Sequence, residues 1–291
     1  AGAIELLVAA LAGGRLPAAA EEHAAGCISG LAPLGENARI IREASGVKPL
    51  VRLLSEGKQG AKEHAAVAIA HLARQHAGLS VATRTVSKEI ADAGGVSALI
   101  KWLHDPNLGS PDIAAHALAE IALDNSDTQA QVILEGALQP LVAMVGAWAQ
   151  LAAQANAVPR PVSFRTSDLS KALKLATAAA GCLATLAKDN APAQLAIAEG
   201  EGITPLLALL KSSEHKSQES ATKALWHLAA LEKNQWLIAR AGGIQTLVGM
   251  LQSSGERTQQ YTAAALESLA KDHVENQIAL SKAGAIQPLV S

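Results

Sequence analysis

The chain has 291 residues, of which 49% are hydrophobic and only 2% aromatic, and its formal net charge is −2. This near-neutral balance, with an isoelectric point of about 6.5, provides no basic surface for a nucleic acid backbone. Because aromatic residues are so rare, the core is predicted to be Ala, Leu, Ile and Val in closely packed helices, which indicates an all-α fold.

One module recurs along the whole sequence. Its starts lie near residues 1, 44, 93, 135, 200, 241 and 283, and the copies read AGAIELLVAAL, ASGVKPLVRLL, AGGVSALIKWL, EGALQPLVAMV, GEGITPLLALL, AGGIQTLVGML and AGAIQPLVS. The intervals between starts are 43, 49, 42, 65, 41 and 42 residues, so two repeats contain insertions. This period is typical of helical repeats that bury their apolar faces only on their neighbours. The sequence therefore predicts a single solenoid domain over residues 1–291, with about six repeats.

The fifth repeat shows the module without an insertion. Residues 203–213 are apolar at helical spacing, and a longer helix is predicted over residues 217–234. Ser217 is placed to cap that helix, and Glu219 in its first turn complements the helix dipole. A short helix follows and ends at the glycine pair 242–243, which suits a left-handed helix end. Each repeat is thus predicted to contain a short first helix, a glycine turn, a second helix and a long third helix.

The entry to the second helix is a glycine turn that leads into a proline and leucine pair, seen as GVKPL, GALQPL, GITPL and GAIQPL. With the long Ala-rich helix that ends in Leu-Ala, this entry resembles the armadillo repeat family over nearly the whole chain. HEAT repeats are the nearest alternative, but their helix pairs lack this entry. The resemblance implies a right-handed superhelix, an armadillo-type α-solenoid. Its long third helices would line a concave groove that holds extended peptides or partner helices, and it implies no catalytic chemistry.

The groove positions of the family differ in this chain. In importin-type and catenin-type armadillo proteins, an asparagine near the end of each third helix bonds the peptide backbone, and a tryptophan four residues earlier packs on its side chains. The asparagine positions hold Gly30, His71, Glu120, Thr185, His227 and Ser268, and the tryptophan positions hold Gly26, Val67, His116, Gly181, Lys223 and Ala264. Neither ladder is present, so a nuclear import adaptor is disfavoured.

Polar and aromatic side chains at the groove are the candidate partner-binding residues. They are His23, His64, His71, His116, Glu120, Thr185, Lys223, His227, Tyr261 and Ser268. His64 and His71 are seven residues apart on one helix face, so a metal site or a pH switch can be imagined. No Cys, Asp or further His completes a ligand set, and we predict neither metal nor cofactor.

Four acidic residues recur near the start of the predicted third helices: Glu22, Glu63, Asp112 and Glu219. They could form an acidic stripe for a basic partner. They could also simply complement the helix dipole, as acids in a first turn do.

Three tryptophans lie within predicted helices. Trp226 directly precedes a groove position, whereas Trp102 and Trp236 belong to other helices. Partial burial between helices is the prediction for all three, although aromatic anchors are favoured at interfaces.

The longest insertion, residues 146–168, belongs to the fourth repeat. AWAQLAAQANAV is predicted to extend the second helix, and PRPVSFRTSD follows as an extended segment. Phe164 lies between Arg160 and Arg165, a composition typical of an interface anchor. Ordinary loop variation, or packing of Phe164 on its own solenoid, is the alternative. A smaller insertion within residues 76–94 is interpreted as a lengthened loop and first helix, without a functional role.

Cys27 and Cys182 occupy the same place in repeats one and four. Three repeats should hold them too far apart for a disulfide, so both are predicted to be reduced and buried. We therefore expect an intracellular, cytoplasmic location, with a membrane-associated or ciliary complex, reached through partners, as the alternative.

The most apolar window spans residues 140–158. Gln150, Gln154 and Asn156 would be costly in a bilayer, so this window is predicted to be an edge helix rather than a membrane span. Both ends of the sequence fall inside repeats, so the chain is expected to be a fragment.

Catalytic motifs are absent from the sequence. It contains no Gly-rich phosphate loop, no Gly-x-Ser-x-Gly elbow, no His-Glu-x-x-His and no Cys-x-x-Cys. We therefore expect a non-enzymatic scaffold that binds a protein segment in its groove, with the insertion adding specificity. The alternative is a permanent structural subunit of a large ciliary, axonemal or membrane-associated assembly. No nucleic acid partner is expected, and the oligomeric state is open.

Overall fold

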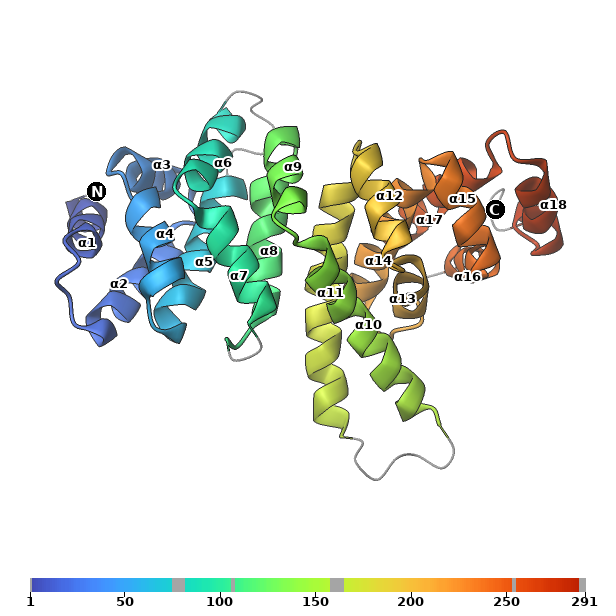
Figure 1. Ribbon diagram of the computed structural model, residues 1–291, viewed down its shortest axis with the longest axis horizontal. Helices are drawn as coiled ribbons and strands as arrows, with labels where there is room; N and C mark the ends of the chain where they lie inside the picture. The colour runs from blue at the N-terminus through green and yellow to red at the C-terminus, as the bar shows by residue number, and fades with distance from the viewer. Residues whose placement is uncertain (1, 75–81, 106–107, 158–164, 253–254, 288–291) are drawn as a thin grey trace. The chain divides into compact units, whose positions relative to one another are not determined.

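The computed structural model describes residues 2–74, 82–105, 108–157, 165–252 and 255–287, which form 18 α-helices and, within these ranges, no strand. The all-α prediction is therefore confirmed. The chain divides into two compact units, Ala1–Ala137 and Leu138–Ser291, and each is described by itself. Figure 1 shows the helices of both units in chain order.

In the first unit the helices follow the predicted order of first, second and third helix. The first helices are α3 (Gly35–Glu43), α6 (Ala82–Asp92) and α9 (Ser126–Leu134). The second helices are α1 (Gly2–Ala12), α4 (Val47–Glu56) and α7 (Gly95–His104). The third helices are α2 (Ala18–Leu31), α5 (Gln59–Arg74) and α8 (Pro111–Ala122).

The second unit repeats the same order. The first helices are α12 (Ala191–Glu199), α15 (Glu232–Arg240) and α18 (Val274–Lys282). The second helices are α10 (Leu138–Ala155), α13 (Ile203–Leu209) and α16 (Gly243–Met250). The third helices are α11 (Thr166–Ala187), α14 (His215–Ala229) and α17 (Glu256–Ala270).

The third helices of each unit pack side by side. In the first unit α5 lies between α2 and α8, and in the second unit α14 lies between α11 and α17. Small side chains such as Ala65, Ala66 and Ala115 are completely buried there, which lets the helix backbones approach closely. One polar pair is also buried between α11 and α14. The hydroxyl groups of Thr177 and Ser217 are 2.7 Å apart and form a hydrogen bond. The prediction of an Ala- and Leu-rich helical core is confirmed.

The start and end of α14 differ from the prediction. The helix begins at His215 with Glu214 as its N-cap residue, so Ser217 does not cap it and is instead buried against α11. It ends at Ala229, well before the predicted residue 234. The chain turns at Leu231, which has an extended conformation, and Glu232 opens the next first helix, where its charge complements the dipole.

The glycine pairs 94–95 and 242–243, which end the first helices α6 and α15, have two separate roles. Gly242 adopts a φ of 78° and ends α15 in the left-handed region, as predicted. Gly243 has ordinary backbone angles but no space, since a Cβ there would lie 2.5 Å from Ile238 Cγ2 and 2.7 Å from its carbonyl oxygen. The same crowding by an isoleucine five residues earlier recurs at Gly46, Gly95 and Gly202.

The long insertion is mainly helical. The second helix α10 has 18 residues where the others have 7 to 11, and the third helix α11 has 22 where the others have 12 to 16. The two helices pack along each other and extend past the rest of the second unit (Figure 1). Trp148 and Ala172 are buried between them, and Gln150 and Gln154 are exposed, as expected of an edge helix. The smaller insertion lengthens α6 to 11 residues, while the other first helices have 9.

Within the described part of the chain, α11 is the one helix long and apolar enough to cross a membrane by length and composition alone. The succession α9 and α10 passes the same test only if it is taken as one broken span. More than half of the apolar window of α11 is buried in the protein, which is typical of a core helix.

The two cysteines have different surroundings. Both are free thiols, as predicted. Cys182 is fully buried on α11, and burial raises its pKa to about 12. Cys27 is exposed, so its predicted burial is wrong. The reason is its helix: α2 packs mainly on α5 and α1, which leaves one side of α2 open to solvent.

Candidate functional site

Each third helix exposes one stripe of side chains, three or four residues apart. In the first unit the stripes consist of His23, Gly26 and Gly30 on α2, Glu63, Val67, His71 and Arg74 on α5, and Ile113, His116 and Glu120 on α8. In the second unit they consist of Lys174, Ala178 and Gly181 on α11, Glu219, Lys223 and Trp226 on α14 with its C-cap residue Ala230, and Gln260, Ala264 and Glu267 on α17 with its C-cap residue Lys271. Because the third helices lie side by side, the stripes of one unit form one surface, which we call its third-helix face.

In the first unit this face is polar and its side chains pair with one another. The carboxylate of Glu120 lies 3.9 Å from Arg74 Nε and 3.9 Å from His116 Nε2. His64 Nδ1 lies 3.4 Å from the hydroxyl of Ser29 on the neighbouring helix. The structure thus brings the predicted residues His116 and Glu120 together. The predicted residues His23 and His71 also lie on this face, His23 exposed and His71 half-buried.

In the second unit the face carries a cluster of three stacked rings. The ring of Trp226 on α14 stacks on His227 with centroids 4.5 Å apart, and on Tyr261 of α17 with centroids 5.6 Å apart. Trp226 and Tyr261 are half-buried, whereas His227 is only 7% exposed. We call these three residues the ring cluster. Lys223, one turn before His227 on α14, is half-buried beside it.

Two further predicted groove residues bond to their own helices. The hydroxyl of Thr185 donates to Gly181 O, and that of Ser268 donates to Ala264 O. Thr185 is buried, so it is further from solvent than the sequence suggests, and Ser268 is half-buried.

The imidazole of His227 is held neutral. Burial, together with the positive charge of Lys223, lowers its pKa from 6.5 to about 4. Its Nε2 atom is buried and makes no hydrogen bond. A proton added to this ring would therefore be destabilising.

We expect the stability of the second unit to fall as the pH is lowered from 6.5 towards 4. The unfolded chain binds a proton on His227 in this range and the folded chain does not, so the stabilisation is complete above pH 6.5 and is lost below it. The loss attributable to His227 should reach about 2 kcal/mol at pH 5. Urea unfolding at several pH values measures it. His227→Ser introduces the residue found at the equivalent position, Ser268. This variant should lose most of the fall in the free energy of unfolding between pH 6.5 and pH 4. An unchanged pH dependence of the free energy of unfolding would contradict the assignment to His227.

Three of the four recurring acids have a local partner or a buried position, and the fourth, Glu22, is half-buried. Only Asp112 lies in a first turn, where it is buried. Glu22, Glu63 and Glu219 lie one turn further into their helices than predicted. Glu63 accepts a hydrogen bond from Gln59 at 2.8 Å, and Glu219 lies 3.4 Å from Arg257 on α17. The presence of Glu63 and Glu219 at these positions is therefore explained by contacts within the chain, and no binding partner is needed to explain it.

Of the three residues predicted to bind a partner in the insertion, only one lies within the described residues. Arg165 is the exposed N-cap residue of α11, while Arg160 and Phe164 lie outside the described residues. Across the described ranges, no group of three His, Cys, Asp or Glu side chains could hold a metal ion.

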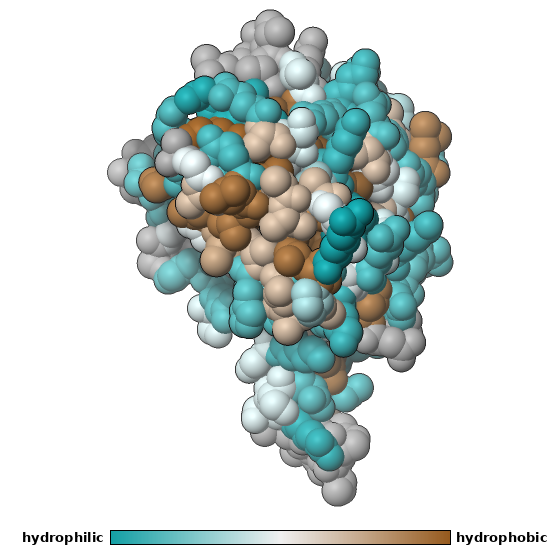
Figure 2. Space-filling view, turned by 90° about the vertical axis from the view of Figure 1, so that its left-hand side faces the viewer, coloured by the Kyte–Doolittle hydropathy of each residue, from teal (hydrophilic) through white to brown (hydrophobic). Residues whose placement is uncertain are grey.

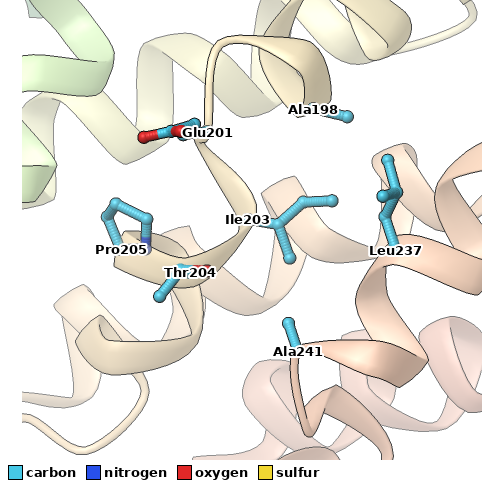
Figure 3. A pocket seen from close by; sticks show the side chains of 7 residues that line it. All are labelled: Ala198, Glu201, Ile203, Thr204, Pro205, Leu237 and Ala241. Atoms are coloured by element: carbon cyan, nitrogen blue, oxygen red, sulfur yellow. The ribbon is translucent and has the colours of Figure 1, made fainter.

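A second surface feature of the second unit lies away from the third helices. A pocket of about 480 Å³ opens between the α12–α13 turn and α15, and Figure 3 shows Ile203 and Leu237 on its opposite sides. Its other lining residues are Ala198, Glu201, Thr204, Pro205 and Ala241. On the same helix as Leu237, Trp236 is 48% exposed and the guanidinium of Arg240 lies 5.0 Å from its ring centroid.

Exposed apolar side chains are also found at the helices nearest the chain ends. Leu6 on α1 is 73% exposed, and Figure 2 shows apolar surface on this side of the first unit. Partial burial was predicted for three tryptophans; Trp102 is fully buried and donates to Gly109 O at 2.8 Å, whereas Trp236 is 48% exposed, so the prediction is wrong for Trp236. Trp226 is half-buried, as the sequence predicts, but it is not among the residues predicted to bind a partner. The sequence signal that could have identified Trp226 as a surface residue of the site is its place directly before His227, which stands at an asparagine position of the family.

Two segments of the chain, residues 36–74 and 232–271, match the model of the armadillo/beta-catenin-like repeat. No curated protein matches the sequence. Each matched segment contains a first, a second and a third helix, α3 to α5 and α15 to α17.

Solved structures of engineered proteins are similar to this chain over most of its length. One engineered protein is 26% identical, covers 93% of this chain and 99% of its own, and has a TM-score of 0.74. A designed armadillo repeat protein is 25% identical, with coverage of 91% and 99% and a TM-score of 0.74. Another designed armadillo repeat protein, in complex with peptide (KR)4, is 22% identical, with coverage of 91% and 99% and a TM-score of 0.71.

Proposed function

We propose that this chain, an armadillo-repeat α-solenoid, is a protein-binding scaffold that holds an extended partner segment on its third-helix face and catalyses no reaction itself. Parallel helices that each expose one stripe offer contacts at regular steps, which suits an extended segment better than a compact ligand. Such a scaffold is expected to act inside the cell, where the exposed Cys27 would stay reduced.

The observation that carries the proposal is the contrast between the two sides of the third helices. Their buried sides repeat Ala and Leu, as the fold requires, but equivalent exposed positions differ from helix to helix. The position of Lys223 holds His116 on α8, Gly181 on α11 and Ala264 on α17. Exposed variation on a constant frame is what a binding surface of a repeat protein needs.

Support also comes from a neighbour in fold, the designed armadillo repeat protein in complex with peptide (KR)4. Its structure shows that a frame of this kind accommodates a peptide. It does not transfer the basic peptide to this chain, whose third-helix face has different side chains.

Site-specific photocrosslinking tests the proposal. A photoreactive amino acid is placed at Lys174, Lys223 or Glu267 on the third-helix face, or at Glu232 or Glu275 on first helices as controls, since all five are surface positions with described surroundings. After irradiation in native extract, the crosslinked peptides are sequenced by mass spectrometry. We expect the three face positions to crosslink neighbouring residues of one partner segment. Equal crosslinking from the first-helix controls would contradict the scaffold proposal.

A second candidate, a permanent subunit of a large assembly, is favoured by the pocket beside Trp236. An exposed tryptophan under an arginine and next to an apolar pocket has the composition of an interface hot spot, and it lies on helices other than the third ones. Sedimentation of the native complex distinguishes the two candidates. A subunit would be found only in large particles, and Trp236→Ala would release it, whereas a scaffold would sediment mainly alone.

A further inference from the structure

The pocket of the second unit has largely apolar walls and one charged side chain. Ala198 and Ile203 are buried in its wall, and Leu237 on α15 is half-buried on the opposite side. Among the described residues that line it, Glu201 is the charged one. Figure 3 shows Glu201 at the rim on the side of Pro205, with its carboxylate directed out of the pocket. A side chain that lies in the pocket therefore meets apolar surface first and a carboxylate where it emerges.

The carboxylate of Glu201 is free to bind a cation. Glu201 is exposed, and within the described ranges no side chain or backbone group pairs with its carboxylate. The nearest acid in the sequence, Glu199, is already paired with Lys233 at 2.8 Å. The guanidinium of Arg240 lies over the ring of Trp236, 5.0 Å from its centroid. A cation from outside the chain can therefore pair with Glu201 without breaking an existing contact.

The backbone at Glu201 does not favour a glutamate. Its φ of 61° lies in the left-handed region, where a Cβ causes strain and glycine is unstrained. The equivalent residue at the end of each described first helix also has a positive φ, and four of the other five are glycines: Gly94, Gly136, Gly242 and Gly284. The fold thus accepts glycine here, and the glutamate lowers stability without forming a contact in the chain. Strain of this kind at a surface position points to a function outside folding.

The surroundings of the pocket favour a protein as the source of the cation. Trp236 is next to Leu237 in the sequence and is one of the exposed large apolar side chains, so apolar surface continues beyond the pocket. A small free cation would leave this ring uncovered, whereas tryptophans are typical anchors of protein interfaces. A lysine side chain fits the pocket itself, because its methylene chain can lie on apolar walls while its ammonium group reaches the rim.

We propose that the pocket between the α12–α13 turn and α15 accepts a lysine side chain of a partner protein. The methylene chain of that lysine packs between Ile203 and Leu237, and its ammonium group pairs with Glu201. The surface of the partner around the lysine covers Trp236. The pocket is built from first and second helices, so this contact is separate from the third-helix face and goes beyond the scaffold proposal.

Alkyl probes of equal chain length test the chemistry of the pocket. Hexylamine, hexanol and hexanoate carry a positive charge, no charge and a negative charge at neutral pH. The chain is labelled at its isoleucine and leucine methyl groups, and the signals of Ile203 and Leu237 are followed by nuclear magnetic resonance. We expect hexylamine to shift both signals saturably and to bind about threefold more tightly than hexanol. Hexanoate should bind more weakly than hexanol.

Variants at Glu201 separate its charge from its backbone strain. Glu201→Gln keeps the side-chain size and should abolish the preference for hexylamine over hexanol. Glu232→Gln, which changes another exposed acid of the same unit, should keep that preference. Glu201→Gly should also lose the preference but raise the midpoint of thermal unfolding by about 2 °C, because glycine relieves the strain. An unchanged midpoint would contradict the cost argued for this position.

A photoreactive amino acid at Thr204, an exposed residue of the pocket, tests for the partner protein. After irradiation in native extract, the crosslinked peptides are sequenced by mass spectrometry. We expect one partner segment with a lysine at the crosslinked site. This crosslink should be lost in Glu201→Gln and kept in Glu232→Gln.

Any of four results would overturn the inference: hexanol binding as tightly as hexylamine, a preference for hexylamine that survives Glu201→Gln, a Thr204 crosslink to a segment without lysine, or no protein crosslinked from Thr204. The crosslinks from the third-helix face test the scaffold proposal separately, so that proposal can stand when this inference fails.

Discussion

Replacing Gly243 with alanine is expected to lower the free energy of unfolding by about 2 kcal/mol. The added methyl group would lie 2.5 Å from Ile238 Cγ2 and 2.7 Å from the carbonyl oxygen of the same residue. Both are buried where α15 meets α16, so the crowding can be relieved only by moving one helix against the other. Urea unfolding followed by circular dichroism measures the loss.

The other repeats indicate which second change should restore stability. Where alanine stands at the equivalent position, the residue five places earlier is not isoleucine: Val132 precedes Ala137, and Leu280 precedes Ala285. We therefore expect Ile238→Leu, which copies Leu280 and lacks the Cγ2 methyl group, to recover about half of the loss caused by Gly243→Ala, with a coupling of about 1 kcal/mol. Strictly additive effects of the two substitutions would contradict this explanation.

A matched control lies on the same helix. Gly249 is exposed on α16, and a Cβ there would meet no atom within 4 Å. Gly249→Ala should therefore raise stability by about 0.5 kcal/mol, because alanine is the better helix former. Opposite signs at two glycines of one short helix would show that the lack of space at Gly243, rather than the residue type, causes the loss.

The repeat architecture could be predicted from sequence because its signals are local and recur. A left-handed residue ends each described first helix; it is a glycine such as Gly242 in four of the six and Ser45 or Glu201 in the other two. The Ala- and Leu-rich pattern indicates the buried side of each third helix. The extension of α10 was equally readable, since residues 147–155 continue a helical pattern. The start of α11 was not, because the helix begins at Thr166, inside the segment 159–168 that was predicted to be extended.

Predictions of individual side chains were less secure because neighbouring positions on a helix point about 100° apart. Ser217 was expected to cap α14, but the helix begins two residues earlier and Ser217 faces α11. Cys27 and Cys182 are equivalent in sequence, yet one is exposed and the other buried, because burial depends on which helices pack beside them. The spacing of apolar residues in the sequence does not show which helices pack beside each cysteine.

The candidate site shows the same limit. His227 was chosen as a groove contact from its position near the end of a third helix, and the structure places it beneath Trp226, where it supports a ring. The stack between Trp226 and Tyr261 joins residues 35 positions apart in different repeats, so only the packing of α14 on α17 brings them together.

Replacing Asn234 with leucine is expected to lower the free energy of unfolding by about 2 to 3 kcal/mol. Asn234 is completely buried, and its Nδ2 donates to Gln194 O at 2.9 Å and to Leu228 O at 3.1 Å. Leu228 is at the carboxyl end of α14, where carbonyl groups lack partners within the helix. Leucine preserves the volume but removes both bonds, so that Leu228 O keeps only the 3.3 Å bond from Leu231 N in a site that water does not reach.

The same bond recurs in other repeats and supplies the control. Asn37 donates to Leu31 O at 3.1 Å and Asn276 donates to Leu269 O at 2.9 Å, each from a first helix to the end of the preceding third helix. Gln277, beside Asn276, makes a bond of equal length to Ala270 O but is exposed. Gln277→Ala should therefore cost less than about 0.5 kcal/mol, because water replaces the lost bond. If Asn234→Leu were as mild as this control, the amide of Asn234 would not be what holds α15 to the end of α14.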